Sequence, residues 1–334
     1  MSNVKKLSLQ TEAGRLRANT AARLAAVCPL LVMAVYWYGP RPLVLCAVAV
    51  VTAVLCDVLA AGLRRRAWQP GDVSSPLFAV LLVCLMPASI SYAIVAATTA
   101  TAILVGKHLF GGSQSYPFHP TALGYVIAVV SWPAQMLTFP APFTRLALTN
   151  TVTFAPAEAP AATLKLAGLP NISTINMVLG NFAGPLGVTA TLVVLACGLL
   201  LLAVRRFELA MPLSFLAACT ALLHWFPRVS GVSGSRLLQM ELLVGGLAFG
   251  MVFLLQDEVT APRGLSARIL YGLLVGVLTV VYQYYSSYPY GVCFGVLWGN
   301  ALSGTLDRVD GFLRARASAL FSRRKKQSRE EQAV

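Results

Sequence analysis

Charged side chains are scarce in this 334-residue sequence, where 11% of the residues are Asp, Glu, Lys or Arg and 57% are hydrophobic. This composition excludes a soluble globular domain. Apolar stretches of about 17 to 25 residues, the length that crosses a bilayer, recur from Ala22 to Leu306. Because backbone groups in lipid need partners within their own segment, we expect an all-α polytopic membrane protein.

The motifs of soluble enzymes are also missing. We find no GxSxG, P-loop or HExxH sequence, and no GxGxxG that follows a strand. The seven cysteines lack CxxC or other metal-ligand spacing, and the three histidines share no spacing, so we expect no metal centre. Two classes remain: a redox subunit whose chemistry belongs to a bound cofactor, and a small-solute transporter or channel. Composition alone favours the transporter.

Apolar spans and polar breaks predict about ten transmembrane helices. We expect them near residues 22–38, 43–62, 74–88, 91–107, 119–138, 185–204, 209–226, 237–256, 269–286 and 289–306. The first twenty residues hold no apolar run that ends in a cleavage site, so the first helix is expected to serve as its own insertion signal.

The formal charge of +14 would indicate nucleic-acid binding in a soluble protein, but the positive-inside rule explains it here. With a cytoplasmic N-terminus, all but five of the 26 Lys and Arg residues fall on the cytoplasmic side. We therefore expect both termini in the cytoplasm, no nucleic-acid partner, and a basic tail helix that anionic membrane lipid attracts. The five exceptions are Arg41, Arg145, Lys165, Arg228 and Arg236.

The helices divide five and five around a polar segment. We expect a cytoplasmic segment 1–21, a membrane half 22–139, an extracytoplasmic loop 140–184, a second half 185–306 and a cytoplasmic tail 307–334. Because five is odd, similar halves would form an inverted repeat. In each half, an apolar run that ends in a Pro-containing patch precedes a helix starting at Tyr-Pro. Within the loop, residues 175–182 could form a short interfacial helix.

Ionisable residues at membrane depth are functional candidates, because burying a charge in lipid is costly. Glu241 is the deepest of them. An ion pair with Arg236, a lipid-facing interfacial position and a role in ion passage all fit its position. His224, beside Trp225, is typical of an interfacial anchor.

Several blocks resemble one known family. Residues 106–136, GKHLFGGSQSYPFHPTALGYVIAVVSWPAQM, resemble the RnfD pattern of Lys, Gly-Gly, Pro-Phe-Asn-Pro-Ala, Gly-Tyr and Ser-Phe-Pro-x-Gln-Met. LGNFAGPLGVTA at 179–190, FLLQDEVTAP at 253–262 and YPYGVCFGVLWGNAL at 288–302 resemble three further family motifs in the same order. The likeness covers roughly residues 20 to 310, and it favours the redox subunit over the transporter.

The resemblance implies the RnfD subunit of an Rnf complex, similar to the NqrB subunit of the sodium-pumping quinone reductase. Such complexes pass electrons between ferredoxin and NAD and couple the flow to sodium or proton translocation. Iron-sulfur, NAD-binding and FMN-carrying subunits are the implied partners. The family carries FMN as a phosphoester on a threonine, and a riboflavin can sit within the helices. The matching residue here is Thr163, in the sequence Pro160-Ala161-Ala162-Thr163-Leu164.

Departures from the family pattern affect individual contacts. Pro160 and Ala161 replace the Ser-Gly before Ala-Thr, and His119 replaces an Asn. The family's Glu and Thr in two further motifs are replaced by Val188 and Gln256.

Six residues are candidate partners of the flavin or the coupling ion. Asn181, Thr189 and the 180–187 backbone could offer donors to a flavin, although these glycines could equally serve close helix packing. Asp257, with Thr260, is the candidate for ion coupling, or else Asp257 caps a helix end facing Arg263. The remaining candidates for cofactor binding are His119 and Lys165. Lys165, together with Arg145, could help to hold the linked phosphate.

Overall fold

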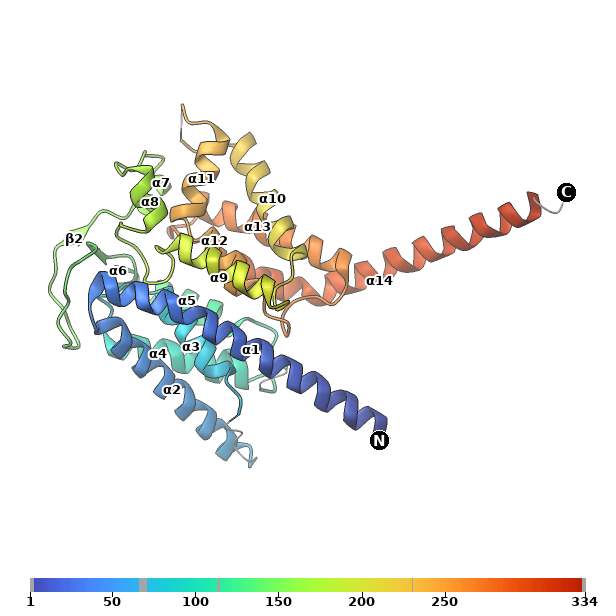
Figure 1. Ribbon diagram of the computed structural model, residues 1–334, viewed down its shortest axis with the longest axis horizontal. Coiled ribbons are helices and arrows are strands. Elements are labelled where there is room, and N and C mark those ends of the chain that lie inside the picture. Colours follow the sequence, from blue (N-terminus) through green and yellow to red (C-terminus); the bar gives the residue numbers. More distant parts are fainter. Residues whose placement is uncertain (1–2, 66–70, 113–114, 230, 332–334) are drawn as a thin grey trace.

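The computed structural model describes residues 3–65, 71–112, 115–229 and 231–331, and it is a bundle of helices (Figure 1). One end carries the strands and the short helices of the central loop, and we call it the loop end. From the opposite side extend the start of α1 and the end of α14, and we call this the termini end (Figure 1). Both described chain ends therefore leave the bundle on one side, as expected for an even number of crossings.

The first half consists of α1 (Asn3–Tyr38), α2 (Arg41–Leu63), α3 (Ser74–Cys84), α4 (Tyr92–Thr101), the π-helix η1 (Ala102–His108), α5 (Pro120–Ser131) and α6 (Pro133–Met136). The central loop holds β1 (Phe139–Pro140), β2 (Pro156–Ala157), α7 (Pro160–Lys165) and α8 (Thr174–Leu179). The strands pair antiparallel, with Phe139 opposite Ala157. A short helix, α8, overlaps the range 175–182 expected for one, but it ends earlier, at Leu179.

The second half consists of α9 (Thr191–Ala203), α10 (Ala210–Trp225), α11 (Gly234–Val244), α12 (Leu247–Phe249), the π-helix η2 (Gly250–Leu254), α13 (Leu265–Tyr285) and α14 (Val292–Glu331). Small residues let the last long helices approach closely. A Cβ on Gly276 of α13 would lie 2.7 Å from the Phe215 carbonyl oxygen of α10, and one on Gly295 of α14 would lie 2.7 Å from Thr279 Oγ1 of α13. Such contacts give helix pairs in lipid their van der Waals packing.

A helical segment lies at each of the ten expected ranges, but several boundaries were wrong. The helix expected at 74–88 ends at Cys84, just before Pro87, which cannot donate an amide hydrogen bond. The helix expected at 119–138 divides at Trp132, because Pro133 begins α6. The segment expected at 185–204 becomes helical only at Thr191.

Two further differences concern the second half. The range 237–256 is broken at Gly245 and Gly246, where α11 and the following helix meet at a bend of 67°. Gly246 has a φ of +77°, a left-handed conformation that favours glycine. The range 289–306 and the basic tail form one continuous helix, α14.

Three of the described helical segments are long and apolar enough to cross a membrane: Gly14–Tyr38, Arg41–Leu63 and Leu265–Tyr285. The bent pair Gly234–Val244 and Leu247–Leu254 would be a fourth span. Four shorter apolar helices, α3, α5, α9 and α10, accompany them. The protein is thus helical and suited to a membrane, while ten crossings and an inverted repeat stay predictions.

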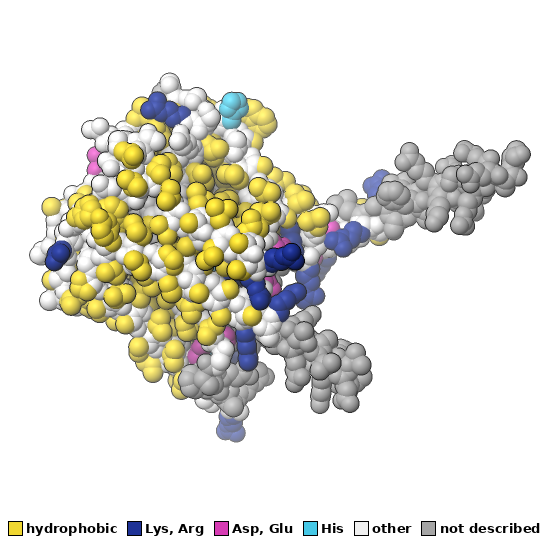
Figure 2. Space-filling model, viewed as in Figure 1, with side chains coloured by type: hydrophobic (Ala, Val, Ile, Leu, Met, Phe, Trp, Pro, Cys, Tyr) yellow, Lys and Arg dark blue, Asp and Glu magenta, His cyan; other side chains and the backbone are white. Residues whose placement is uncertain are grey.

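The polarity of the bundle is that of a protein in lipid. Large apolar side chains face outward: Val32, Leu55 and Leu199 are 68%, 63% and 67% exposed. Hydrophobic side chains are spread over the whole face seen in Figure 2, whereas Lys and Arg side chains lie mainly at its edges. Arg41 and Lys107, by contrast, are fully buried. In a bilayer, outward apolar groups contact the acyl chains and inward charged groups must find partners within the protein.

Arg41 ties the central loop to the first half. Its Nε donates to the Ala88 carbonyl at 2.8 Å, its Nη2 to Ile90 at 2.9 Å, and its Nη1 to Ala147 and Thr149, each at 2.6 Å. The planar guanidinium therefore satisfies carbonyls both of the break after α3 and of the loop. The two segments are more than fifty residues apart in sequence, and this side chain holds them together.

Substitution of Arg41 by Lys should destabilise the protein, because one ammonium cannot replace the guanidinium at four carbonyls. Each buried carbonyl left without a donor costs roughly 1–3 kcal/mol. We expect the melting temperature in detergent, followed by dye labelling of the buried cysteines, to fall by about 5 °C or more. Arg145→Lys, at an exposed loop position, is the matched control. Equal melting temperatures for the two variants would contradict the role of Arg41.

Candidate functional site

Thr163 lies on α7 at the loop end. The helix begins at Pro160, whose fixed φ suits the first helical turn, and it spans only six residues. Thr163 is half-buried, and its Oγ1 donates to Glu158 Oε1 at 2.8 Å. The hydroxyl predicted to carry FMN is thus partly accessible and lies beside a carboxylate that can accept its proton.

Lys165 ends α7 and points toward the second half. Its Nζ donates to the Ser286 carbonyl just after α13, where the exposed carbonyls of a helix end favour a cation. Burial lowers the pKa of the Lys165 amine, and the nearby Arg228 guanidinium lowers it further. The Lys165 ammonium therefore links α7 to the end of α13, and its described hydrogen bond goes to Ser286 instead of Thr163.

The glycine-rich stretch after α8 is closely packed. A Cβ on Gly180 would lie 2.5 Å from the Thr189 carbonyl oxygen, and a Cβ on Gly187 would lie 2.5 Å from Cys84 Cβ. The Gly187 amide also donates to the Cys84 carbonyl at 2.7 Å and so joins the two halves. Asn181 is half-buried, whereas Thr189 is buried with its Oγ1 unpartnered among the described residues. The glycines thus serve packing, and the Thr189 hydroxyl is left with a free hydrogen-bonding valence.

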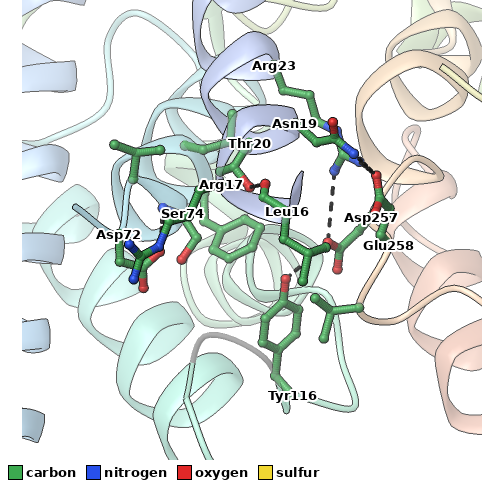
Figure 3. Close-up of a pocket in the computed structure, with 14 residues that line it drawn as sticks. Leu16, Arg17, Asn19, Thr20, Arg23, Asp72, Ser74, Tyr116, Asp257 and Glu258 are labelled. Atoms are coloured by element: carbon green, nitrogen blue, oxygen red, sulfur yellow. Dashed lines mark hydrogen bonds and ion pairs between the residues drawn. The ribbon is translucent and has the colours of Figure 1, made fainter. Parts of the chain in front are cut away.

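Asp257 lines a small polar pocket at the termini end (Figure 3). Tyr116 donates to its Oδ1 at 3.0 Å, Thr260 donates to its Oδ2 at 3.0 Å, and Arg23 from α1 lies 4.0 Å away. The described cationic partner is therefore Arg23, whereas the Arg263 amide bonds Asp307. The pocket has a volume of about 60 Å³, space for a few water molecules.

His119 lies near this pocket. It is buried immediately before α5, and its ring packs edge-on against Phe78, with centroids 5.4 Å apart. Phe78 also lines the pocket and packs against Tyr116. The His119 Nδ1 atom has no hydrogen-bond partner among the described residues. The structure therefore brings His119, Asp257 and Thr260 together, apart from Thr163 and Lys165 at the loop end.

The same end carries a basic cavity. Its volume is about 780 Å³, and Figure 2 shows Lys and Arg side chains gathered near the base of the projecting α14. Glu258 bridges to Arg23 at 3.8 Å and accepts a hydrogen bond from Asn19. Basic residues outnumber acidic ones in its lining: Arg15, Arg23, Arg205, Arg206, Arg263 and Arg268 against Glu208 and Glu258.

Sequence reasoning missed a buried charged cluster between α2 and η1. Lys107 Nζ lies 2.9 Å from Asp72 Oδ2, 3.3 Å from Asp57 Oδ1 and 2.6 Å from Ser75 Oγ. His108 Nε2 lies 2.6 Å from the same Asp57 oxygen. The π-helical turn places Lys107 and His108 side by side toward Asp57. An aspartate inside an apolar span was the signal that could have found this cluster.

Comparison with known proteins assigns the chain to a family. The model of the NQR2, RnfD, RnfE family matches residues 8–311. The chain belongs to this family. The match covers both halves and the central loop, so the resemblance inferred from separate motifs to RnfD is confirmed.

Three relatives within this family illustrate the similarity. The D subunit of the ion-translocating oxidoreductase complex of Pseudomonas aeruginosa (strain UCBPP-PA14) is 34% identical over 303 residues, 85% of this chain and 87% of the relative. The protein of that name from Haemophilus influenzae (strain Rd) is 27% identical, covering 91% and 97%. The D subunit of the proton-translocating ferredoxin:NAD(+) oxidoreductase complex of Clostridium ljungdahlii is 27% identical, covering 85% and 86%.

Lys107→Met should destabilise this NQR2, RnfD, RnfE family member by about 3–5 kcal/mol, because it removes the cation between two carboxylates in a buried site. Adding Asp57→Asn should recover part of the loss, since the second change removes one of the uncompensated charges. Melting temperatures of the wild type, both single variants and the double variant measure this coupling. Arg145→Met controls for loss of an exposed cation, and simple additivity would contradict the described pairing.

Proposed function

We propose that this chain is the RnfD-type membrane subunit of an ion-translocating ferredoxin:NAD oxidoreductase. The observation that carries the proposal is the family match over residues 8–311, together with relatives named as D subunits of such complexes. The chain acts as an electron relay and is not catalytic alone. Its partners are the iron-sulfur, NAD-binding and FMN-carrying subunits, which supply the electron donor and acceptor sites.

The test of this assignment is isolation of the tagged chain from its own membranes. We expect the other subunits to copurify, and we expect deletion of the chain to abolish ferredoxin-dependent NAD reduction in membrane vesicles. The alternative is a small-solute transporter, for which the bent α11–α12 pair is the supporting feature, since broken helices mark many transport sites. A solitary oligomer that moves ammonium or urea in proteoliposomes would favour that alternative.

The electron relay in this proposal is FMN joined to Thr163 through a phosphoester. A hydroxyl that forms a phosphoester must be reachable and must lose its proton. The Thr163 hydroxyl is partly accessible, and it donates a hydrogen bond to the Glu158 carboxylate, which can accept that proton. Lys165 is two residues away on the same helix and adds positive potential for the phosphate. A riboflavin within the helices would find polar atoms at His119 and Thr189 that have no hydrogen-bond partner in the described part of the chain, and Asn181 offers a further amide.

Thr163→Ala should remove covalent flavin, because no oxygen is then left to form the ester. The chain is expressed with a flavin transferase and examined on a denaturing gel for flavin fluorescence. We expect a fluorescent wild-type band, a dark Thr163→Ala band and a fluorescent Thr174→Ala control from the same loop. A dark wild-type band, or a Thr163→Ala band that still fluoresces, would refute the attachment.

Asp257 and Thr260 are the proposed coupling residues, for either sodium or protons. Their support is the buried pocket in which Asp257 meets Arg23, Tyr116 and Thr260. A carboxylate held among a cation and two hydroxyls can bind or release a small cation as its surroundings change.

Asp257→Asn should reduce ion transport per electron in proteoliposomes holding the whole complex, because the amide carries no charge. Flavin fluorescence should stay unchanged, which separates coupling from cofactor loss. Glu258→Gln, at the more exposed neighbouring position, is the matched control. Unchanged coupling in Asp257→Asn would assign Asp257 a purely structural role.

The proposed setting is the prokaryotic plasma membrane, with the loop end outside and both termini in the cytoplasm. The arginine-rich cavity and the basic α14 at the termini end support this orientation through the positive-inside rule. Thr163 and its FMN would then face the outer side.

A further inference from the structure

A buried carboxylate lies next to the break between α11 and α12. Glu241 is 3% exposed and sits in the last turn of α11, one turn before Gly245. Its carboxylate folds back on the break, so that a Cβ on Gly245 would collide with Glu241 Oε2. We find no hydrogen bond or ion pair for this carboxylate within residues 3–65, 71–112, 115–229 and 231–331.

An unsatisfied acceptor lies at the same place. Gln283 of α13 is 1% exposed, and its Nε2 donates to the Gly245 carbonyl at 3.1 Å. The same Nε2 atom would lie 3.1 Å from a Cβ on Gly245, so the Gln283 amide and the Glu241 carboxylate meet at this glycine. Gln283 Oε1 is buried and lacks a donor among the described residues. The side chain that carries this unsatisfied oxygen and the Glu241 carboxylate therefore approach the same glycine.

The surroundings favour a neutral carboxyl group. At this depth, a carboxylate that lacks a hydrogen-bond donor among the described residues is costly to keep charged. Glu241 also sits at the carboxyl end of α11, where the helix dipole opposes negative charge. Gln283 occupies the corresponding last turn of α13. The carboxyl ends of α11 and α13 therefore both favour the binding of a proton by the Glu241 carboxylate.

A nearby cation opposes permanent protonation of the Glu241 carboxylate. Arg228 acts electrostatically on Glu241 and donates to the Gln283 and Tyr284 carbonyls. Lys165 reaches the nearby Ser286 carbonyl. Other titratable groups lie on α11 and on the elements around it: Arg236 on α11, Cys197 on α9, Cys219 and His224 on α10, Tyr282, Tyr284 and Tyr285 on α13, and Tyr290 before α14. Arg228 stabilises the ionised form, so the carboxyl group can release its proton as well as hold it.

We propose that Glu241 is a proton-binding site on the loop end, with Gln283 as its hydrogen-bond acceptor. When the carboxylate takes up one proton, the new O–H bond donates to Gln283 Oε1 and satisfies it. When the proton returns to water at the loop end, Arg228 faces the resulting negative charge. The site is separate from Asp257, which lies at the termini end, and it requires neither FMN on Thr163 nor the coupling role of Asp257.

Infrared difference spectroscopy of the assembled complex tests the site directly, because a protonated carboxylic acid has its own carbonyl-stretch band. We expect a band in the wild type at neutral pH that disappears at alkaline pH and is absent in Glu241→Gln. Glu208→Gln, which changes an exposed glutamate at the termini end, should keep it. Gln283→Leu should move the band to higher frequency, because the acid loses its hydrogen-bond acceptor.

Three results would overturn the proposal. Identical spectra of the wild type and Glu241→Gln at every pH would show that Glu241 never holds a proton. A band that persists at alkaline pH would mark a permanently neutral, structural carboxyl group. If sodium abolishes the carbonyl-stretch band and choline does not, Glu241 binds a metal cation in place of the proton. If Glu241→Gln fails to assemble, the Gln283→Leu spectrum decides, and an unshifted band refutes the pairing.

Discussion

Charged groups and backbone carbonyls inside an apolar bundle need hydrogen-bond or ion-pair partners from the chain itself. This requirement governs the structure. Water cannot serve these groups in lipid, so buried charges mark the points where distant segments must meet. Arg41 holds the central loop against the break after α3. Lys107 joins η1 to α2 and to the start of α3 through Asp57, Asp72 and Ser75. These contacts hold the loop against the first half, and η1 against α2 and the start of α3.

The interruptions of the helices follow from the same requirement. Wherever a helix stops inside the bundle, its free amides and carbonyls need other partners. After α3, Arg41 and the amides of Leu186 and Gly187 supply them. After α11, Gln283 takes the Gly245 carbonyl, and Thr191 donates to the Leu243 carbonyl at 2.7 Å. The breaks are therefore stabilised features, and polar side chains cluster beside them.

The candidate functional groups are separated between the two ends of the bundle. The loop end holds Thr163, Lys165 and Glu241, and the termini end holds His119 and Asp257. In the proposed electron-transfer role, flavin chemistry at one end and ion binding at the other must influence each other through the bundle. The closely packed contact of Gly187 with Cys84 links the two halves by backbone hydrogen bonds, and it provides a rigid connection between them.

The sequence by itself determined the membrane class, the approximate place of each helix and the family. Apolar periodicity and motif order are local properties that need no knowledge of contacts. It also placed Thr163 in a polar loop. Only the tertiary structure decided where helices break. The chain can leave the helix at Gly245 and Gly246 because Thr191 on α9 and Gln283 on α13 satisfy the carbonyls freed there. Likewise, Asp257 meets Arg23, more than two hundred residues away, and not the nearby Arg263. Sequence spacing cannot specify such pairs, since chain folding alone brings the segments together.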